Sequence, residues 1–240
     1  MKVLVVRAAE DARRTAARLA ATGHPAIVAP VLVIRALDFA APDGGFDAVV
    51  ATSAHAFGQP ARLAPFLAAK LLVVGGRTAE AARSAGFAAA SAVAANAVEL
   101  AAAASRALPR GARLLYFAGR DRKPDLEAAL APPFALAVVE TYAAEAANAL
   151  PAAAAEALRA GGAAVLHYSQ RSAAVFLDLA LRAGLAGKLR GLAHIAISRD
   201  AAEPLIAAGL EVAVAAQPNE DSMFEQLARI ETARNRAGDA

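Results

Sequence analysis

Serine and arginine side chains follow several apolar, strand-like segments of the sequence, at positions where they could bind an anion. Ser53 and Ser169 each come directly after such a segment and would lie in the first turn of a helix. Arg7 and Arg120 end two further apolar segments. A guanidinium group is well suited to carboxylates and phosphates, and open parallel sheets bind ligands at the carboxyl ends of their strands. These side chains therefore indicate an anionic ligand.

One sequence pattern, in which a strand is followed by a turn and a helix, occurs twice in the chain. Each copy consists of an apolar strand, a tight turn and a helix that ends at glycine, and is followed by an asparagine that could cap a second helix. The copies are Val74–Glu80 with Gly86 and Asn96, and Ile197–Glu203 with Gly209 and Asn219. The duplication predicts two similar lobes, with the functional site in a cleft between them.

Another pair of similar segments occurs in a different order in the two halves. Lys2–Arg7 resembles Arg113–Arg120, but the first begins the chain and the second follows the asparagine-capped helix. The lobes become alike when residues 1–36 and 146–240 form one lobe and residues 37–145 form the other. The sequence thus predicts one discontinuous lobe, one continuous lobe and a chain that crosses between them twice.

Apolar strand-like segments alternate with amphipathic helical segments along the chain. Asp11–Ala21 and Ser172–Ala183 are two of the helical segments, and residues 87–90 are among the strand candidates. This alternation predicts an α/β fold with two similar parallel-sheet lobes and flanking helices. Val31–Leu37 and Val138–Ala144 are extended where the chain crosses between lobes, so we expect them to pair as a two-stranded connector.

The composition argues against several classes of protein. A chain of 240 residues can form two small domains with a core each, and 58% hydrophobic residues argue against disorder. With no cysteine there is no disulfide, thiol nucleophile or cysteine metal site. The four histidines have no close ligand spacing, so we expect no metal ion. The net charge is only +3 and the basic residues are scattered, which argues against nucleic-acid binding.

The hydrophobic content does not predict a membrane protein. The longest charge-free run, Leu19–Ile34, is interrupted by glycine and proline and is shorter than the ~20 apolar residues of a spanning helix. The first residues reach Arg7 and Glu10 after a short apolar run and lack the apolar centre of a signal peptide. We therefore expect a cytoplasmic protein without a membrane segment, and a monomer.

Five of these segments, taken in order, resemble the uroporphyrinogen-III synthase family. They are Val5–Arg7, Thr52–Ala56, Val74–Ala79, Val139–Tyr142 and Tyr168–Ala173. The resemblance runs from Met1 to about Ile230. It implies an enzyme that closes linear hydroxymethylbilane into uroporphyrinogen III, with inversion of ring D, loss of water and no cofactor. It also implies two α/β lobes joined by a two-stranded ladder, and it allows a transient contact with hydroxymethylbilane synthase.

The resemblance implies two catalytic candidates. Tyr142 matches the tyrosine proposed in the family to assist departure of the substrate hydroxyl, and it lies in the expected connector. Thr78 matches a threonine on the rim of the family's cleft. The alternatives are that Tyr142 is a half-buried packing residue and that Thr78 satisfies backbone N–H groups in the first turn of its helix.

The implied substrate carries eight carboxylates and so needs many hydrogen-bond donors, which helix N-termini also supply. The candidate substrate-binding residues are Arg7, Ser53, Gly75, Gly76, Arg120, Ser169, Gln170, Arg171 and Ser198. Helix capping is the alternative for the serines, and solvated charge at a strand end is the alternative for the arginines. In the second turn Asp200 would repel a polyanion unless Arg199 neutralises it.

Two other functions stay open. The first is a non-catalytic two-lobed protein that binds an anionic small molecule, since such proteins also cross between lobes. The second is a nucleotide-dependent transferase, but the chain has neither G-x-G-x-x-G nor G-K-[ST], so the phosphate loops that such enzymes use are missing.

Overall fold

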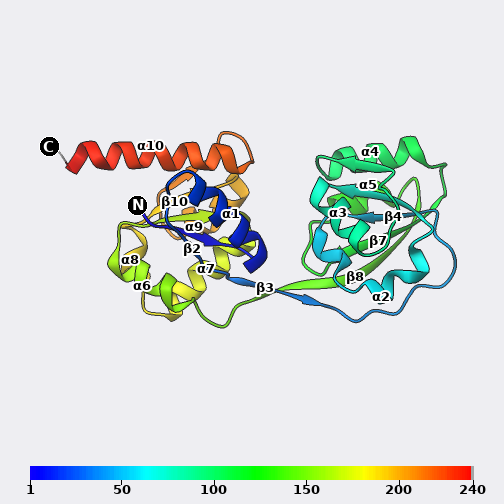
Figure 1. Cartoon of the computed structure of the whole chain (residues 1–240), viewed down its shortest axis with the longest axis horizontal. Coiled ribbons are helices and arrows are strands. Elements are labelled where there is room, and N and C mark those ends of the chain that lie inside the picture. The colour runs from blue at the N-terminus through cyan, green and yellow to red at the C-terminus, as the bar shows by residue number, and fades with distance from the viewer. Residues whose placement is uncertain (239–240) are drawn as a thin grey trace. The chain divides into compact units, whose positions relative to one another are not determined.

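The chain folds into two compact units, seen here in a computed structural model that describes residues 1–238 (Figure 1). Unit 1 combines Met1–Val33 with the chain from Glu145 onward, and unit 2 is Ile34–Ala144. The expected α/β fold of parallel sheets with flanking helices is confirmed. Within the described residues, no helix is both long and apolar enough to cross a bilayer.

Strands and helices alternate along most of the chain. The strands are β1 (Val3–Val6), β2 (Ala26–Val28), β3 (Leu32–Ala36), β4 (Ala48–Ala51), β5 (Lys70–Val74), β6 (Ala92–Ala94), β7 (Arg113–Gly119), β8 (Ala135–Ala146), β9 (Ala164–His167), β10 (Ala193–Ala196) and β11 (Val212–Val214). The α-helices are α1 (Ala9–Ala21), α2 (Pro60–Leu63), α3 (Gly76–Ser84), α4 (Ala97–Ala107), α5 (Asp125–Leu130), α6 (Ala152–Ala160), α7 (Gln170–Arg182), α8 (Ala186–Leu189), α9 (Arg199–Ala207) and α10 (Glu220–Gly238). Two short 3₁₀ helices are η1 (Ala54–Phe57) and η2 (Ala64–Phe66).

Unit 1 is built on a parallel sheet with the strand order β11-β10-β9-β1-β2. Side chains of β1 alternate between its two faces. Val3 and Val5 pack with α1 and α10, whereas Leu4 and Val6 pack with α6 and α7. Both faces of the strand are thus covered by helices, which explains its unbroken apolar sequence.

The first strand of the chain is an inner strand of this sheet. Val3 is in register with Ala26 of β2 on one side and with Ala164 of β9 on the other. The N-terminal segment is therefore part of the same sheet as the C-terminal third of the chain.

Unit 2 is built on a sheet with the order β3-β8-β7-β4-β5-β6. Leu114 and Tyr116 of β7 face a core shared with α4 and α5. Leu115 and Phe117 face the opposite core, where the Phe117 ring centroid lies 5.5 Å from that of Phe66. The aromatic rings of Phe39, Phe57 and Phe87 complete this second core around Phe117.

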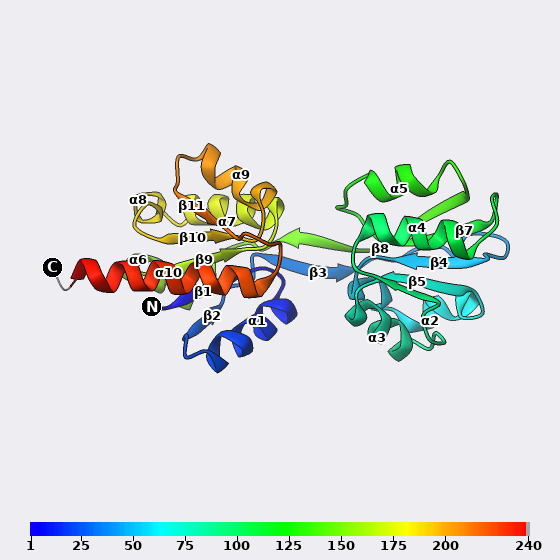
Figure 2. The same cartoon turned by 90° about the horizontal axis from the view of Figure 1, so that it is seen from above.

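The chain passes between the units through β3 and β8, which are neighbours in the sheet (Figure 2). Leu37 N donates to Thr141 O and Ala147 N donates to Val31 O, both at 2.9 Å. The residue numbers rise along one strand as they fall along the other, so the pair is antiparallel. Both expected connector segments thus lie largely in strands, and the units divide within β3, at Val33/Ile34, and within β8, at Ala144/Glu145.

One predicted strand is wrong. Residues 87–90 do not form a strand, and the edge strand β6 comes later, at Ala92–Ala94. Phe87 accounts for the apolar start of this segment, because its side chain is buried in the aromatic core just after α3 ends. An apolar run predicts burial, and here the burial does not involve strand pairing.

Substitution of Phe117 tests the packing of the aromatic core of unit 2. The side chain is 1% exposed and contacts four other phenylalanine rings. We expect Phe117→Ala to lower the free energy of unfolding by about 3–5 kcal/mol, because it leaves a cavity. Urea unfolding followed by circular dichroism measures this.

Val98→Ala is the matched control, since Val98 is 80% exposed and its truncation should change stability by less than about 0.5 kcal/mol. Equal unfolding midpoints for the two variants would contradict the assignment of Phe117 to the centre of this core.

Candidate functional site

In unit 2, the chain after β4 places Ser53 at the start of η1. The Ser53 Oγ accepts a hydrogen bond from the backbone N of His55 at 3.3 Å, which caps this short helix. The neighbouring Thr52 hydroxyl lies 3.2 Å from the Tyr116 hydroxyl, whose pKa is raised by burial. Ser53 is therefore a cap in this structure, and its predicted contact with substrate is a separate role.

The next strand, β5, ends at the paired glycines of the first duplicated turn. Gly75 has a φ of +79°, a conformation that glycine adopts without strain. A Cβ atom at Gly75 or Gly76 would meet nothing within 4 Å, so the backbone faces open space there. Because the N-cap of α3 is Gly75, it has no side-chain oxygen to offer to the first-turn N–H groups. This helix end is suited to an anion.

Thr78 lies in the first turn of α3 and is 4% exposed. Its backbone N donates to Gly75 O at 3.1 Å. The burial of Thr78 agrees better with a local structural role than with a freely accessible hydroxyl. The helix that carries it, α3, packs against η1.

At the end of β7, Arg120 and Arg122 share the carboxylate of Glu140. Arg120 Nε lies 3.4 Å from Glu140 Oε2, and Arg122 Nη1 lies 3.0 Å from Glu140 Oε1. Arg122 also contacts Glu127 at 2.5 Å, which raises the pKa of its guanidinium. Of the two arginines, Arg120 is the more exposed, at 54% of its side chain. Arg122 thus links the end of β7 to α5, and the guanidinium of Arg120 is the more accessible of the two.

A β-bulge between β7 and β8 sets the position of Tyr142. Ala118 pairs with Glu140, but the next residue, Gly119, pairs with Tyr142, so Thr141 is the extra residue. A Cβ atom at Gly119 would lie 2.7 Å from Cζ and 2.8 Å from the phenol oxygen of Tyr142. Any residue larger than glycine at this position would displace the tyrosine ring.

In unit 1, Arg7 follows β1 as predicted, but two carboxylates of the same unit already contact it. Its Nη1 lies 3.3 Å from Glu220 Oε1 and its Nη2 lies 3.6 Å from Asp11 Oδ2. The guanidinium also lies 4.1 Å from the ring centroid of Tyr168. Burial raises the pKa of that tyrosine, so it stays neutral.

Sequence reasoning missed Glu220, the first residue of α10. Its carboxylate accepts hydrogen bonds from Thr15 and Arg18, both at 2.5 Å, as well as from Arg7. More than 200 residues of sequence separate these groups, so no local pattern could have paired them.

The hydroxyl after β9, Ser169, caps α7. Its Oγ accepts from Ser172 N at 3.1 Å, and the Ser172 hydroxyl in turn donates to Ser169 O at 3.1 Å. The next residue, Gln170, donates to Glu203 of α9 at 2.7 Å. Arg171 follows in the same turn and is half-buried. The structure thus brings Ser169, Gln170 and Arg171 together at one helix N-terminus.

The second duplicated turn, after β10, differs electrostatically from the first. Ser198 caps α9, and its Oγ accepts from Ala201 N at 3.3 Å. Asp200 stands in the first turn of α9, where a carboxylate stabilises the helix end. A serine cap therefore stands where α3 has Gly75, and a carboxylate stands where α3 has Arg77.

A histidine pair lies buried beneath the end of β9. His194 Nε2 lies 3.0 Å from Leu189 O and therefore donates to it, which leaves its Nδ1 to accept from His167 Nε2 at 3.2 Å. Among the described residues, His167 Nδ1 finds no hydrogen-bond partner. Burial lowers the pKa of both imidazoles, that of His167 well below its usual value. The pair is neutral and structural.

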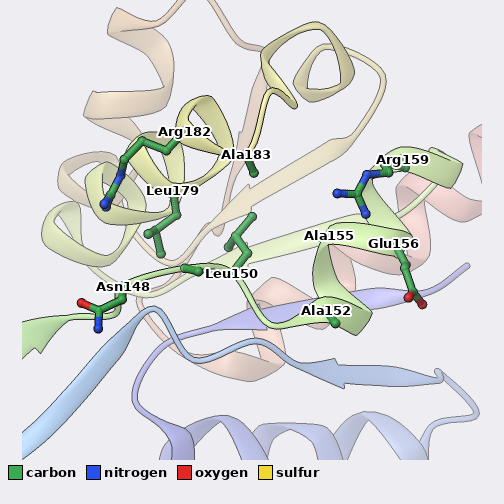
Figure 3. Close-up of a pocket in the computed structure, with 10 residues that line it drawn as sticks. Asn148, Leu150, Ala152, Ala155, Glu156, Arg159, Leu179, Arg182 and Ala183 are labelled. Atoms are coloured by element: carbon green, nitrogen blue, oxygen red, sulfur yellow. The ribbon is translucent and has the colours of Figure 1, made fainter.

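Unit 1 also contains a pocket of ≈ 430 Å³ (Figure 3). It lies beside α6 and the last turns of α7, and its labelled lining includes Leu179, Arg159 and Arg182. A helix rises about 1.5 Å per residue, so these α7 residues lie ~15 Å or more from Ser169. None of the predicted site residues lines it. Among the described residues, no group of acidic, histidine or cysteine side chains is arranged to hold a metal ion.

The fold and the residues at the ends of its strands together define the class of protein. This is an α/β protein of two parallel-sheet units joined by two strands, with hydroxyl, glycine and arginine residues where strands end. Residues 13–225 match the family model described as uroporphyrinogen-III synthase HemD, and the chain belongs to this family of cyclising lyases of tetrapyrrole biosynthesis. The resemblance seen in the sequence is confirmed.

Solved structures show the same fold. The chain is similar to uroporphyrinogen-III synthetase from Helicobacter pylori 26695, with a TM-score of 0.64 and 15% identity over 96% of this chain and 100% of that one. It is also similar to a mutant uroporphyrinogen III synthase from the extremely thermophilic bacterium Thermus thermophilus, with a TM-score of 0.53 and 18% identity over 97% of this chain and 100% of that one. No curated protein matches the sequence. The comparisons give no support to a non-catalytic binding protein.

The buried histidines predict how stability depends on pH. In the unfolded chain they titrate near pH 6.5, whereas in the folded chain burial lowers the pKa of both, which keeps them neutral to lower pH. Below about pH 6.5 the unfolded chain therefore binds more protons, and stability falls as the pH falls further. We expect the urea midpoint to decrease from about pH 7.5 to about pH 5.5, and to decrease less steeply in His167→Leu. An identical pH slope in the two proteins would contradict this.

Proposed function

We propose that this chain converts hydroxymethylbilane into uroporphyrinogen III, with inversion of ring D and loss of water, as an enzyme of heme biosynthesis. The family match over residues 13–225 supports the reaction. Within the chain, the observation that carries the proposal is the placement of the Tyr142 phenol across Gly119 by the bulge in β8. Such a device aims one polar group at a defined point and recurs next to active sites.

Departure of the substrate hydroxyl needs a proton at its oxygen and leaves an azafulvene cation. The Tyr142 phenol is suited to assist this step, since it can transfer its proton to the leaving oxygen as water forms, and it can regain a proton when the attacking pyrrole carbon loses one after ring closure. This cation is electron-poor, and the electron-rich pyrrole carbon that attacks it needs no strong base to activate it. The remaining task of the protein is therefore to fold the linear substrate and direct which carbon attacks.

The carboxylates of the substrate need donors, and unit 2 offers them at the ends of β5 and β7, the two strands that flank β4. The N-terminus of α3 begins at Gly75 and Gly76, where the backbone faces open space, and Arg120 is more than half exposed. We assign these groups to substrate carboxylates. Two further residues stabilise the backbone of this region. Ser53 caps η1, and Thr78 is buried in the first turn of α3.

Unit 1 offers a second set of donors, at the N-terminus of α7. Ser169, Gln170 and Arg171 lie in one turn, and the helix dipole favours an anion there. Ser198 would contribute less, because Asp200 stands in the same turn. A substrate carboxylate at Arg7 would have to compete with Glu220 for the guanidinium.

Tyr142→Phe tests the leading role of the phenol. Loss of one positioned donor typically costs about ten- to a thousandfold in rate, so we expect ring closure to slow by that range while the product remains the III isomer. Initial rates and the ratio of isomers I and III, with hydroxymethylbilane generated in a coupled assay, measure both. Ser53→Ala and Thr78→Ala should slow the reaction less.

Tyr116→Phe is the matched control, because it removes a phenol hydroxyl from the same sheet on the face packed with α4 and α5. Its rate should stay within about twofold of wild type, since its hydroxyl contacts Thr52 and has no part in the proposed step. If Tyr142→Phe matches wild type while Thr78→Ala abolishes activity, the leading role belongs to Thr78.

A further inference from the structure

We propose that His55 is a positioning residue for Tyr142, holding the phenol in place by ring packing rather than by proton transfer. The inference deepens the proposed function and rests on it. The two rings belong to unit 2, with centroids 5.7 Å apart and planes inclined at 59°. This tilted geometry is typical of packed ring pairs.

Two of the neighbours of the Tyr142 ring restrict it. Gly119 lies so close that even a Cβ atom would come within 3.0 Å of ring atoms, and the His55 ring is the second neighbour. Tyr142 itself is only half-buried, so the core does not enclose its ring completely. Truncation of the imidazole would therefore remove one of the surfaces that define where the phenol oxygen lies.

The backbone of His55 is itself well fixed. Its N donates to Ser53 Oγ at 3.3 Å, and its O accepts from Gly58 N at 3.4 Å. Phe57, two residues on, is anchored in the aromatic core, 5.6 Å from the Phe87 ring and 6.3 Å from the Phe117 ring. The helix η1 thus connects the rigid core of unit 2 to the Tyr142 side chain. A rigid support of this kind is what a reacting group requires, since small displacements are costly in rate.

The first experiment compares His55→Ala with His55→Phe. We expect His55→Ala to lower kcat about ten- to a hundredfold with KM changed less than about threefold, because substrate contacts remain and the phenol is displaced. His55→Phe keeps a planar ring without the nitrogen atoms and should restore kcat to within about threefold of wild type. Equal loss in both variants would show that the imidazole acts chemically and would overturn the proposal.

The second experiment is a double-mutant cycle with Tyr142→Phe. If His55 acts only through the phenol, His55→Ala should slow the Tyr142→Phe variant by less than about twofold. A full additional loss in that background would overturn the proposal. Gly119→Ala, which pushes the ring from the other contact, should lower kcat by a factor similar to that of His55→Ala. Circular dichroism and the urea midpoint confirm that each variant is folded.

The two proposals fail separately. If Tyr142→Phe keeps the wild-type rate, the assignment of the phenol to catalysis is wrong and the positioning role falls with it. If Tyr142→Phe slows ring closure while His55→Ala keeps the wild-type kcat, only the positioning role is wrong.

Discussion

Parallel strand pairing is the constraint on which the rest of this structure depends. Strands that run in the same direction end at the same edge of their sheet, so whatever follows them is gathered there. In unit 2 the turns after β4, β5 and β7 are brought together in this way, and in unit 1 those after β1, β9 and β10. Residues remote in sequence become neighbours through backbone pairing alone. Side chains then need only local support, which the caps Ser53, Ser169 and Ser198 provide.

The duplicated turn shows how one backbone design carries two electrostatic characters. Both copies lead from a buried strand into a nine-residue helix, α3 or α9. In the first, Gly75 leaves the helix dipole without a side-chain partner at the cap. In the second, Ser198 accepts a first-turn N–H bond and Asp200 adds a negative charge. The two turns are therefore alike in fold and unequal in their attraction for anions.

Alternating apolar and amphipathic segments were enough to predict the α/β fold, since both faces of these sheets are covered and the strands read as unbroken apolar runs. The connector was predictable because Val31–Leu37 and Val138–Ala144 are extended where the permuted order requires crossings. The strand at 87–90 was wrong because burial of Phe87 imitates a strand in sequence. The Glu220 contacts of Arg7 and the bulge at Thr141 could not be predicted. Both depend on tertiary register, which a single sequence does not encode locally.

The inner position of β1 determines the order in which the two units can fold while the chain is being synthesised. Unit 2 is continuous, so all of its strands have been synthesised once the ribosome passes Ala146, the last residue of β8. Strand β1 is made first, yet its partner β9 begins only at Ala164. Until then the segment Val3–Val6, which is fully buried in the finished protein, has only the short strand β2 as a neighbour. The nascent chain therefore carries an apolar, unpaired strand edge while its middle is already able to fold, and unpaired edges of this kind are prone to pair with other chains.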